Sequence, residues 1–316
     1  MKFWNLWEKI GIFVITFITL IVFAVLTPSV LSKANIINLL SQSSLIAIAG
    51  MGMTFAVTGG GFDLSIGSLL ALITCVLGKT VPEFGLWGGF AIALVVGIIL
   101  GAFNGLIITK FKIQTFVATL ATMTIYRGVS LVYTQGRDAT LFGSGYQSIK
   151  IFSGGELFHI PMPVILMFLV YLTGYILYKY TSFGVYVRSI GSNKGASEIS
   201  GIQVDRTIIL IFIMTAVTTV FSGAILTSQL LVGTSRYGTT FALEVITAVI
   251  LGGTSLAGGR GNLWGTLMAA IVLTLMKNGL NLLGVNVFYQ WLATGLFLIL
   301  ALSISGIREL VREKSA

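Results

Sequence analysis

Charged residues are scarce in this sequence, and their scarcity excludes a fold surrounded by water. They make up 9% of the 316 residues, while apolar residues make up 56%. A soluble domain carries about 25% charged residues. We therefore expect lipid to surround most of the chain.

Residues that build disulfides or metal sites are also nearly absent. Cys75 is the only cysteine and His159 the only histidine. One thiol cannot form an internal disulfide, and one histidine without further ligands does not make a metal site. We expect neither feature. The sequence also lacks a cluster of nucleophiles or acids that would predict a catalytic residue, so we do not expect an enzyme.

A phosphate-binding loop is missing as well. Gly78, Lys79 and Thr80 match the end of the pattern G-x-x-x-x-G-K-[ST], in which backbone amides and the lysine surround phosphate. The first glycine of the pattern would stand at position 73, which is Ile73. We expect no ATP or other cofactor to bind this chain by that motif, so an ATPase that drove it would be another polypeptide.

Apolar runs take up most of the chain. A helix needs about 20 apolar residues to cross about 30 Å of hydrocarbon. Ten runs meet or approach this length, near residues 10–27, 42–58, 64–80, 86–109, 114–134, 162–181, 208–231, 241–258, 262–282 and 287–306. We predict an all-α polytopic membrane protein with about ten transmembrane helices, some broken by glycines, forming a single transmembrane domain over residues 1–316.

Basic residues indicate how these spans are oriented. If the N-terminus is cytoplasmic, twelve lysines and arginines fall in inside segments and five in outside segments. Positive charge favours the cytoplasmic side, so we predict that both termini are cytoplasmic. Residues 135–161 then form an external loop and residues 181–207 a cytoplasmic loop. The same rule accounts for the net charge of +9 without nucleic acid as a partner.

Four ionisable residues fall in or beside the spans, namely Asp63, Arg127, Glu244 and Lys277. Carriers driven by ion gradients often place such residues in the membrane, but no relay emerges here. Asp63 follows three glycines and Phe62, and we predict that it caps the third span; a place in a transport pathway or a contact with an ATPase is the alternative. Arg127 and Glu244 lie near predicted outer ends, where they can reach water, and Lys277 has no evident partner.

The cytoplasmic loop contains signals for a short helix. Asn193 can cap it, small residues can fill it, and Gly201 can end it. A short helix across the cytoplasmic face can bind another protein, and an ordinary loop helix is the alternative.

Three stretches together resemble the permease subunits of ribose-type ATP-binding-cassette (ABC) importers. They are residues 58–68 (TGGGFDLSIGS), residues 191–202 (GSNKGASEISGI), and residues 251–261 (LGGTSLAGGRG) with 278–285 (NGLNLLGV). The similarity runs over nearly the whole chain. Phe62 stands where such permeases usually have isoleucine, which leaves room for a different substrate.

The resemblance implies an assembly in the bacterial cytoplasmic (inner) membrane. Two permease copies, as a homodimer, would form the pore, a cytoplasmic ATPase would bind ATP and magnesium, and an external solute-binding protein would deliver a sugar such as ribose. Residues 191–202 match the family's coupling loop, which inserts into the ATPase. We assign to it Gly191, Asn193, Ala196, Ser197, Glu198, Ser200 and Gly201.

Two further groups of candidates follow from the same interpretation. Polar residues in or near spans are candidates for the translocation pathway: Asp63, Ser65, Asn104, Thr115, Asn278, Asn281 and Gln290. Basic residues of the outer loops are candidates for docking the binding protein: Arg137, Lys150 and Arg236. For each pathway candidate, a hydrogen bond between packed helices is an equally good interpretation.

The substrate stays open among several classes. Within the importer class, another pentose or hexose, autoinducer-2 or a nucleoside are alternatives to ribose. A gradient-driven carrier acting alone is the alternative from another class, and dependence on a separate ATPase separates the two.

Overall fold

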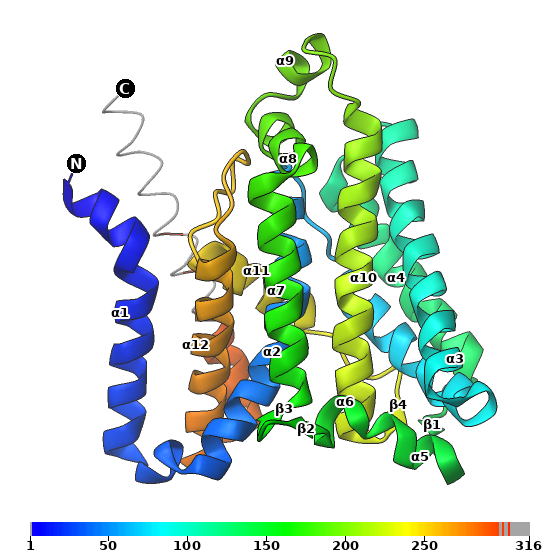
Figure 1. The fold of residues 1–316 in the computed structure, drawn as a ribbon, viewed down its shortest axis with the longest axis vertical. Coiled ribbons are helices and arrows are strands. Elements are labelled where there is room, and N and C mark those ends of the chain that lie inside the picture. The colour runs from blue at the N-terminus through cyan, green and yellow to red at the C-terminus, as the bar shows by residue number, and fades with distance from the viewer. Residues whose placement is uncertain (1, 297–298, 300–302, 304–316) are drawn as a thin grey trace.

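The computed structural model describes residues 2–296, 299 and 303 of the chain. Most of this part is helical (Figure 1). The longer helices are α1 (Lys2–Leu26), α2 (Lys33–Thr58), α3 (Ile66–Lys110), α4 (Thr115–Thr134), α7 (Met162–Tyr180), α8 (Ser182–Ser192), α10 (Val204–Leu230), α11 (Phe241–Leu251) and α12 (Leu263–Leu282). The shorter ones are η1 (Pro28–Leu31), α5 (Gly143–Ile149), α6 (Ile151–Gly154) and α9 (Lys194–Ile199).

Each predicted span overlaps helical residues, with differences at the ends. Helix α2 begins at Lys33 rather than at residue 42, and α11 ends at Leu251 rather than at residue 258. The last span, 287–306, is helical over residues 287–296, and its remainder lies mostly outside the described residues. Six of the described helices are long and apolar enough to cross a membrane: α2, α3, α4, α7, α10 and α12. The chain is therefore a polytopic helical membrane protein, and the count of ten stays a prediction.

Helix α3 contains two of the predicted spans. Its 45 residues would extend about 67 Å as one straight helix, more than twice the hydrocarbon thickness. The backbone at Gly85 is not helical, with φ 71° and ψ 175°, a conformation that glycine adopts without strain. The helix therefore turns at this residue, as the predicted spans 64–80 and 86–109 required.

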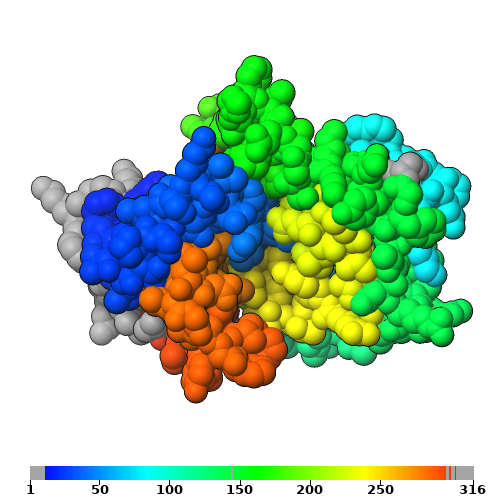
Figure 2. All heavy atoms as spheres, turned by 90° about the horizontal axis from the view of Figure 1, so that it is seen from below, coloured from blue at the N-terminus to red at the C-terminus, as the bar shows by residue number. Residues whose placement is uncertain are grey.

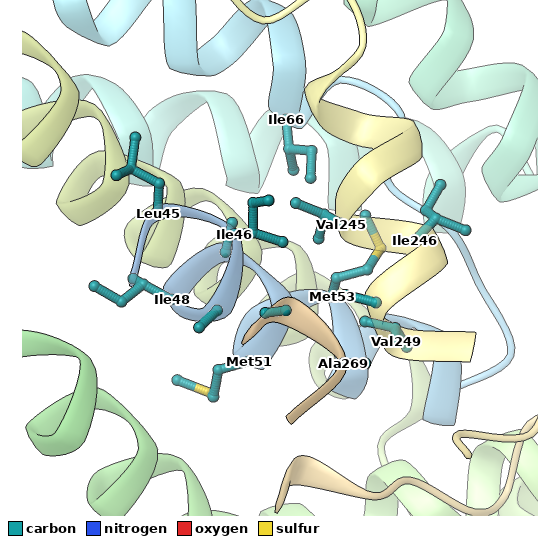
Figure 3. Packing of buried hydrophobic residues seen from close by; sticks show 14 of the residues in the cluster. Leu45, Ile46, Ile48, Met51, Met53, Ile66, Val245, Ile246, Val249 and Ala269 are labelled. Carbon is teal, nitrogen blue, oxygen red and sulfur yellow. The ribbon is translucent and has the colours of Figure 1, made fainter. Parts of the chain in front are cut away.

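Helix α2 forms the centre of the bundle. Nearly all of its residues from Ser43 to Thr58 are buried, and it contacts α7, α10, α11 and α12. Figure 3 shows Ile46 and Met53 of α2 beside Val245 and Val249 of α11. A helix that is apolar on all sides is expected to be enclosed by other helices, which is what α2 shows.

Large apolar side chains also cover the outside of the bundle. Exposed examples come from α1, α3, α4 and α7: Phe17, Val25, Val95, Ile99, Val132 and Phe168. Water would make such a surface unfavourable, whereas lipid accommodates it. These helices therefore supply the lipid-facing surface that the composition predicted.

The bundle has two opposite ends, which we name by the elements that they carry. The α9 face carries α8 and α9, and α1 begins on this side (Figure 1). The hairpin face, at the opposite end, carries α5, α6 and four short strands: β1 (Ala139–Thr140), β2 (Glu156–Leu157), β3 (Ile160–Pro161) and β4 (Val232–Gly233). Strand β1 pairs antiparallel with β4, and β2 pairs antiparallel with β3.

Candidate functional site

Helix α9 projects from the α9 face as a short, capped helix (Figure 1). The Oδ1 atom of Asn193 accepts a hydrogen bond from the backbone N–H of Ala196 at 2.9 Å. At the other end Gly201 has φ 81°, and its N–H donates to the carbonyl of Glu198 at 3.0 Å. The N–H of Ile202 donates to the carbonyl of Ser197 at 3.1 Å. These bonds complete a glycine-ended helix stop, so the predicted cap and end of this helix are confirmed.

The candidate coupling residues divide into an exposed tip and a buried base. Five of them are exposed at the tip: Asn193, Ala196, Glu198, Ser200 and Gly201. Beside them Ile199, which the sequence analysis did not select, is 91% exposed. Ser197 is buried and Gly191 is half-buried against the bundle. The tip therefore offers an apolar side chain among small and polar ones, and a partner protein can cover it.

Helix α8 is the platform that carries α9. Its Val187 and Ile190 are buried, and its Phe183 stacks on Phe55 of α2 with ring centroids 5.7 Å apart. The guanidinium of Arg188 lies over the ring of Tyr178, 4.8 Å from its centroid. Aromatic and cation–π contacts of this kind fix α8 on the ends of α2 and α7.

A cavity of about 850 Å³ lies next to this platform. Its lining comes from the end of α2, the α3–α4 connection, the α8–α9 region and the start of α10. Among the pathway candidates only Thr115 lines it. Four charged residues also line it, namely Lys112, Lys194, Glu198 and Asp205. A cavity with this mixed charge is suited to water and polar solutes.

Three other pathway candidates are joined in one buried hydrogen-bond network. Oδ1 of Asp63 accepts bonds from the N–H and the hydroxyl of Ser65, at 3.0 and 2.5 Å. Oδ2 of Asp63 accepts from the hydroxyl of Thr215 in α10 at 2.9 Å. Asn104 donates to the hydroxyl of Ser65 at 2.8 Å and accepts from the hydroxyl of Tyr126 at 2.9 Å. Asp63 and Ser65 are 0% exposed and Asn104 is 1% exposed.

This network corrects one prediction and leaves another open. Helix α3 begins at Ile66, so Ser65 rather than Asp63 occupies the N-cap position. The reason is that Asp63 bonds to the backbone two residues ahead and to α10, which fixes the loop rather than the helix end. Its place in the transport pathway stays a prediction.

The remaining pathway candidates connect helices to one another. Asn278 of α12 and Asn35 of α2 exchange two side-chain hydrogen bonds, each 2.9 Å long. Nε2 of Gln290 donates to Oδ1 of Asn281 at 2.8 Å. Each pair satisfies polar groups that lipid would leave unsatisfied. Pathway roles for these three residues stay predictions.

The ionisable residues of the spans have partners that the sequence did not reveal. Nζ of Lys277 lies 2.6 Å from Oε1 of Glu244, and both side chains are largely buried. Glu244 thus does not reach water by itself, contrary to expectation, because α11 and α12 pack side by side. Nη1 of Arg127 donates to the carbonyls of Ser235 and Tyr237. No sequence pattern could have indicated these contacts, since each joins residues far apart in the chain.

The docking candidates are brought together on the hairpin face. Arg137, Lys150 and Arg236 are all exposed. Strand pairing between β1 and β4 places residues 135–161 beside residues 232–240, and Figure 2 shows these segments as adjoining green and yellow surfaces. The two loops predicted to be external thus form one surface rather than two.

The helical fold and its glycine-rich breaks indicate a class of protein. Residues 59–65 form a non-helical, glycine-rich segment between α2 and α3, buried at Gly61 and from Asp63 to Ser65, and a second glycine-rich break separates α11 from α12. Helices broken in this way are typical of membrane transport proteins.

The chain belongs to the family described as branched-chain amino acid transport system / permease component, whose model matches residues 35–302. It is 40% identical over 317 residues to the ribose import permease protein RbsC of Bacillus subtilis (strain 168), covering 98% of this chain and 94% of that protein. It is 35% identical to RbsC of Escherichia coli (strain K12), covering 98% and 96%. It is 32% identical to the D-allose transport system permease protein AlsC of E. coli (strain K12), covering 94% and 91%. No solved structure matches the chain at a significant level.

Proposed function

We propose that this chain is the permease subunit of an ABC importer that moves a monosaccharide into the cytoplasm, with ribose as its first candidate substrate. One observation carries the proposal: over nearly their full length, relatives at 35–40% identity are named ribose import permeases. A xylose transport system permease protein of Haemophilus influenzae is 30% identical over 87% of this chain. The sugar class therefore rests on several relatives, and ribose rests on those with the highest identity among them.

The family description names branched-chain amino acids, but it does not set the substrate. The family model covers residues 35–302, and the sugar permeases match across the same region and beyond it. We therefore assign the sugar rather than an amino acid.

The proposed assembly divides its tasks between the two faces. A separate ATPase, which holds ATP and magnesium, binds the tip of α9 on the cytoplasmic side. A solute-binding protein docks on the hairpin face, where Arg137, Lys150 and Arg236 are exposed. A second copy of the permease completes the pore as a homodimer. The sugar passes unchanged, so this chain needs no catalytic residue.

Reconstituted vesicles test the proposal directly. Labelled D-ribose uptake would be measured with the permease, its ATPase and its binding protein, with and without ATP. We expect uptake only when all three parts and ATP are present. Uptake by the chain alone, abolished by an ionophore, would replace the proposal by a gradient-driven carrier. ATP-dependent uptake of allose, xylose, autoinducer-2 or a nucleoside without ribose would keep the importer and replace the substrate.

Two sets of variants test which face binds which partner. Glu198→Trp with Gly201→Trp should abolish copurification of the ATPase, because both residues are exposed at the tip of α9. The same protein should still bind the binding protein. Charge reversal at Arg137, Lys150 and Arg236 should abolish binding of the solute-binding protein and leave copurification of the ATPase intact. High salt should also weaken binding of the solute-binding protein to the wild type. Loss of both partners in either set would contradict the division.

Orientation needs its own measurement. In a background of Cys75→Ser, a cysteine at exposed Lys194 should react with an impermeant thiol reagent only from the cytoplasmic side. A cysteine at exposed Lys150 should react only from outside. The reverse pattern would invert the predicted topology.

A further inference from the structure

Three glycine-containing segments meet beneath α8, at a place that we call the glycine junction. The segments are residues 58–61 at the end of α2, residues 191–192 at the end of α8, and residues 258–261 between α11 and α12. They come from three distant parts of the sequence. One of them immediately precedes the helix that we assign to ATPase binding.

The junction is held by backbone contacts. The N–H of Gly259 donates to the carbonyl of Thr58 at 2.8 Å. A β-carbon at position 191 would overlap the carbonyl oxygen of Thr58 and lie 2.5 Å from the nitrogen of Gly259. A β-carbon at Gly258 would lie 2.7 Å from the carbonyl oxygen of Gly191. Because backbone atoms cannot turn aside as side chains do, a movement of one segment toward its neighbours would be passed on to them.

An aromatic side chain ties the junction to a fourth helix. The N–H of Gly261 donates to the hydroxyl of Tyr178 in α7 at 2.8 Å. The ring of Tyr178 makes an edge contact with Phe55 of α2, with centroids 5.5 Å apart. A β-carbon at Gly261 would overlap Oγ1 of Thr58 and lie 3.1 Å from the hydroxyl of Tyr178. The junction therefore has no free space on this side either.

The connection from the junction to α9 is short. Only Asn193 separates α8 from α9, and its backbone is bonded on both sides. Its N–H donates to the carbonyl of Ser189 at 2.9 Å, and its own carbonyl accepts from the N–H of Ser197 at 3.1 Å. A force on α9 is therefore passed to the end of α8 without a flexible linker.

The junction is continuous in sequence with both helix breaks, residues 59–65 and residues 252–262. Residues 59–65 continue from Thr58 to the start of α3, where Gly67 packs against Gly238. Gly238 belongs to the loop 232–240, part of the surface proposed to dock the binding protein. Residues 258–261 lead directly to α12. A displacement of α8 would thus reach the starts of α3 and α12 together.

We propose that the glycine junction transmits the movement of α9 to both helix breaks, and that Gly191 and Gly261 are positioning residues for coupling ATP hydrolysis to transport. This rests on the proposed function, since it requires an ATPase on α9. Gly191 is needed because a β-carbon there would overlap backbone atoms, and Gly261 because a β-carbon there would overlap Oγ1 of Thr58. Tyr178 holds the third segment in place through its bond to Gly261. Adding one carbon would separate the segments while leaving the tip of α9 able to bind the ATPase.

The test measures sugar molecules taken up per ATP hydrolysed by the complete reconstituted complex. For Gly261→Ala we expect this ratio to fall about tenfold, with the ATPase still copurifying. Adding Thr58→Ala should restore most of the ratio, because it removes the Oγ1 atom that the new carbon overlaps. Tyr178→Phe adds no atoms and removes the hydrogen bond to Gly261. We expect it to lower the sugar uptake per ATP about threefold.

A matched control separates coupling from packing. A β-carbon at Gly97 of α3 would lie 2.5 Å from a methyl group of Val220 in α10, and Val220→Ala would relieve that overlap. We expect Gly97→Ala to lower thermal stability but to leave the uptake per ATP of the surviving protein unchanged. An equal loss of the ratio in Gly97→Ala and Gly261→Ala would overturn the junction's role.

The remaining outcomes are also decisive. If Gly261→Ala takes up as much sugar per ATP hydrolysed as the wild type, the inference is overturned while the importer function stands. If Gly261→Ala does not insert into the membrane, a wild-type ratio in Tyr178→Phe has the same consequence. A wild-type complex that binds no ATPase and takes up no sugar with ATP would overturn the proposed function itself. The two failures are therefore distinguishable before any variant is compared.

Discussion

The two helix breaks of this protein are both rich in glycine but are held in different ways. The first, residues 59–65, is fixed by side chains, because Asp63 bonds to Ser65 within the break and to Thr215 of α10. The second, residues 252–262, is fixed mainly by close backbone packing and by Asn262, which caps α12 and donates to the carbonyl of Gly252 at 3.0 Å. The helices on either side of it are also joined by the ion pair of Glu244 and Lys277.

This difference indicates where each break can be disturbed. Removing a side chain should release the first break, since its contacts are made by side-chain oxygens and hydroxyls. Adding a carbon should disturb the second, since its contacts are between backbone atoms. The four predictions below test this contrast, from the largest expected effect to the smallest.

Asp63→Ala should have the largest effect. It removes the acceptor of three buried hydrogen bonds, so we expect a loss of about 3 kcal/mol in the free energy of unfolding. Asp63→Asn keeps one acceptor oxygen for Ser65 and should lose about half as much. Thermal unfolding in detergent measures both. Equal stability of the alanine variant and the wild type would show that the network does not hold the first break.

Lys277→Met should come next. It leaves the carboxylate of Glu244, which is 12% exposed, without its cation, and we expect a loss of about 2 to 3 kcal/mol. The double variant Lys277→Met with Glu244→Leu should recover most of it, because an apolar pair needs no partner. The same unfolding measurement applies. A double variant less stable than the single one would argue for a second role of Glu244.

Gly265→Ala tests the backbone packing of the second break. Its new carbon would overlap the carbonyl oxygen of Gly252, so we expect a loss of about 2 kcal/mol. Gly128→Ala is the matched control on a helix, because nothing lies within 4 Å of its β-carbon position. There we expect no loss, and a gain of up to about 1 kcal/mol. Equal changes in stability for Gly265→Ala and Gly128→Ala would show that the backbone contact between Gly265 and Gly252 does not stabilise the second break.

Asn262→Ala should have the smallest effect of the four. It removes the cap of α12 and the bond to Gly252, and we expect a loss of about 1 kcal/mol. Asn262→Asp keeps the capping oxygen but not the donor, so it separates the two contributions. A loss in the aspartate variant equal to that in alanine would assign the effect to the bond with Gly252 rather than to the cap.

Local features of the site were predicted well from the sequence. Asn193 caps α9, and Gly201 ends it, because caps and left-handed glycines act within a few residues. The glycine-rich stretch at residues 59–61 lies between two predicted spans and is non-helical. The span predicted over residues 241–258 was too long, because α11 ends at Leu251, just before Gly252 and Gly253. The prediction that Asp63 caps α3 was wrong, because a partner 152 residues away in the chain, Thr215, takes one of its oxygens.

Contacts between distant segments were beyond the sequence. Nothing in it indicated that Lys277 pairs with Glu244, that Tyr126 closes the network of Asn104, or that residues 191, 258 and 261 converge. Each of these depends on how helices pack, and helix packing in lipid is set by close fit rather than by a hydrophobic pattern.

The sequence by itself determined that lipid surrounds this protein and that its chain forms many apolar helices, since these follow from composition and apolar length. Its similarity to sugar permeases determined the family. Only the tertiary structure decided which polar groups meet inside the bundle, because buried donors and acceptors must find partners wherever the chain brings them. It also decided that the end of α8 packs against both breaks at once, a contact that requires glycine at position 191 because a β-carbon there would overlap the carbonyl oxygen of Thr58.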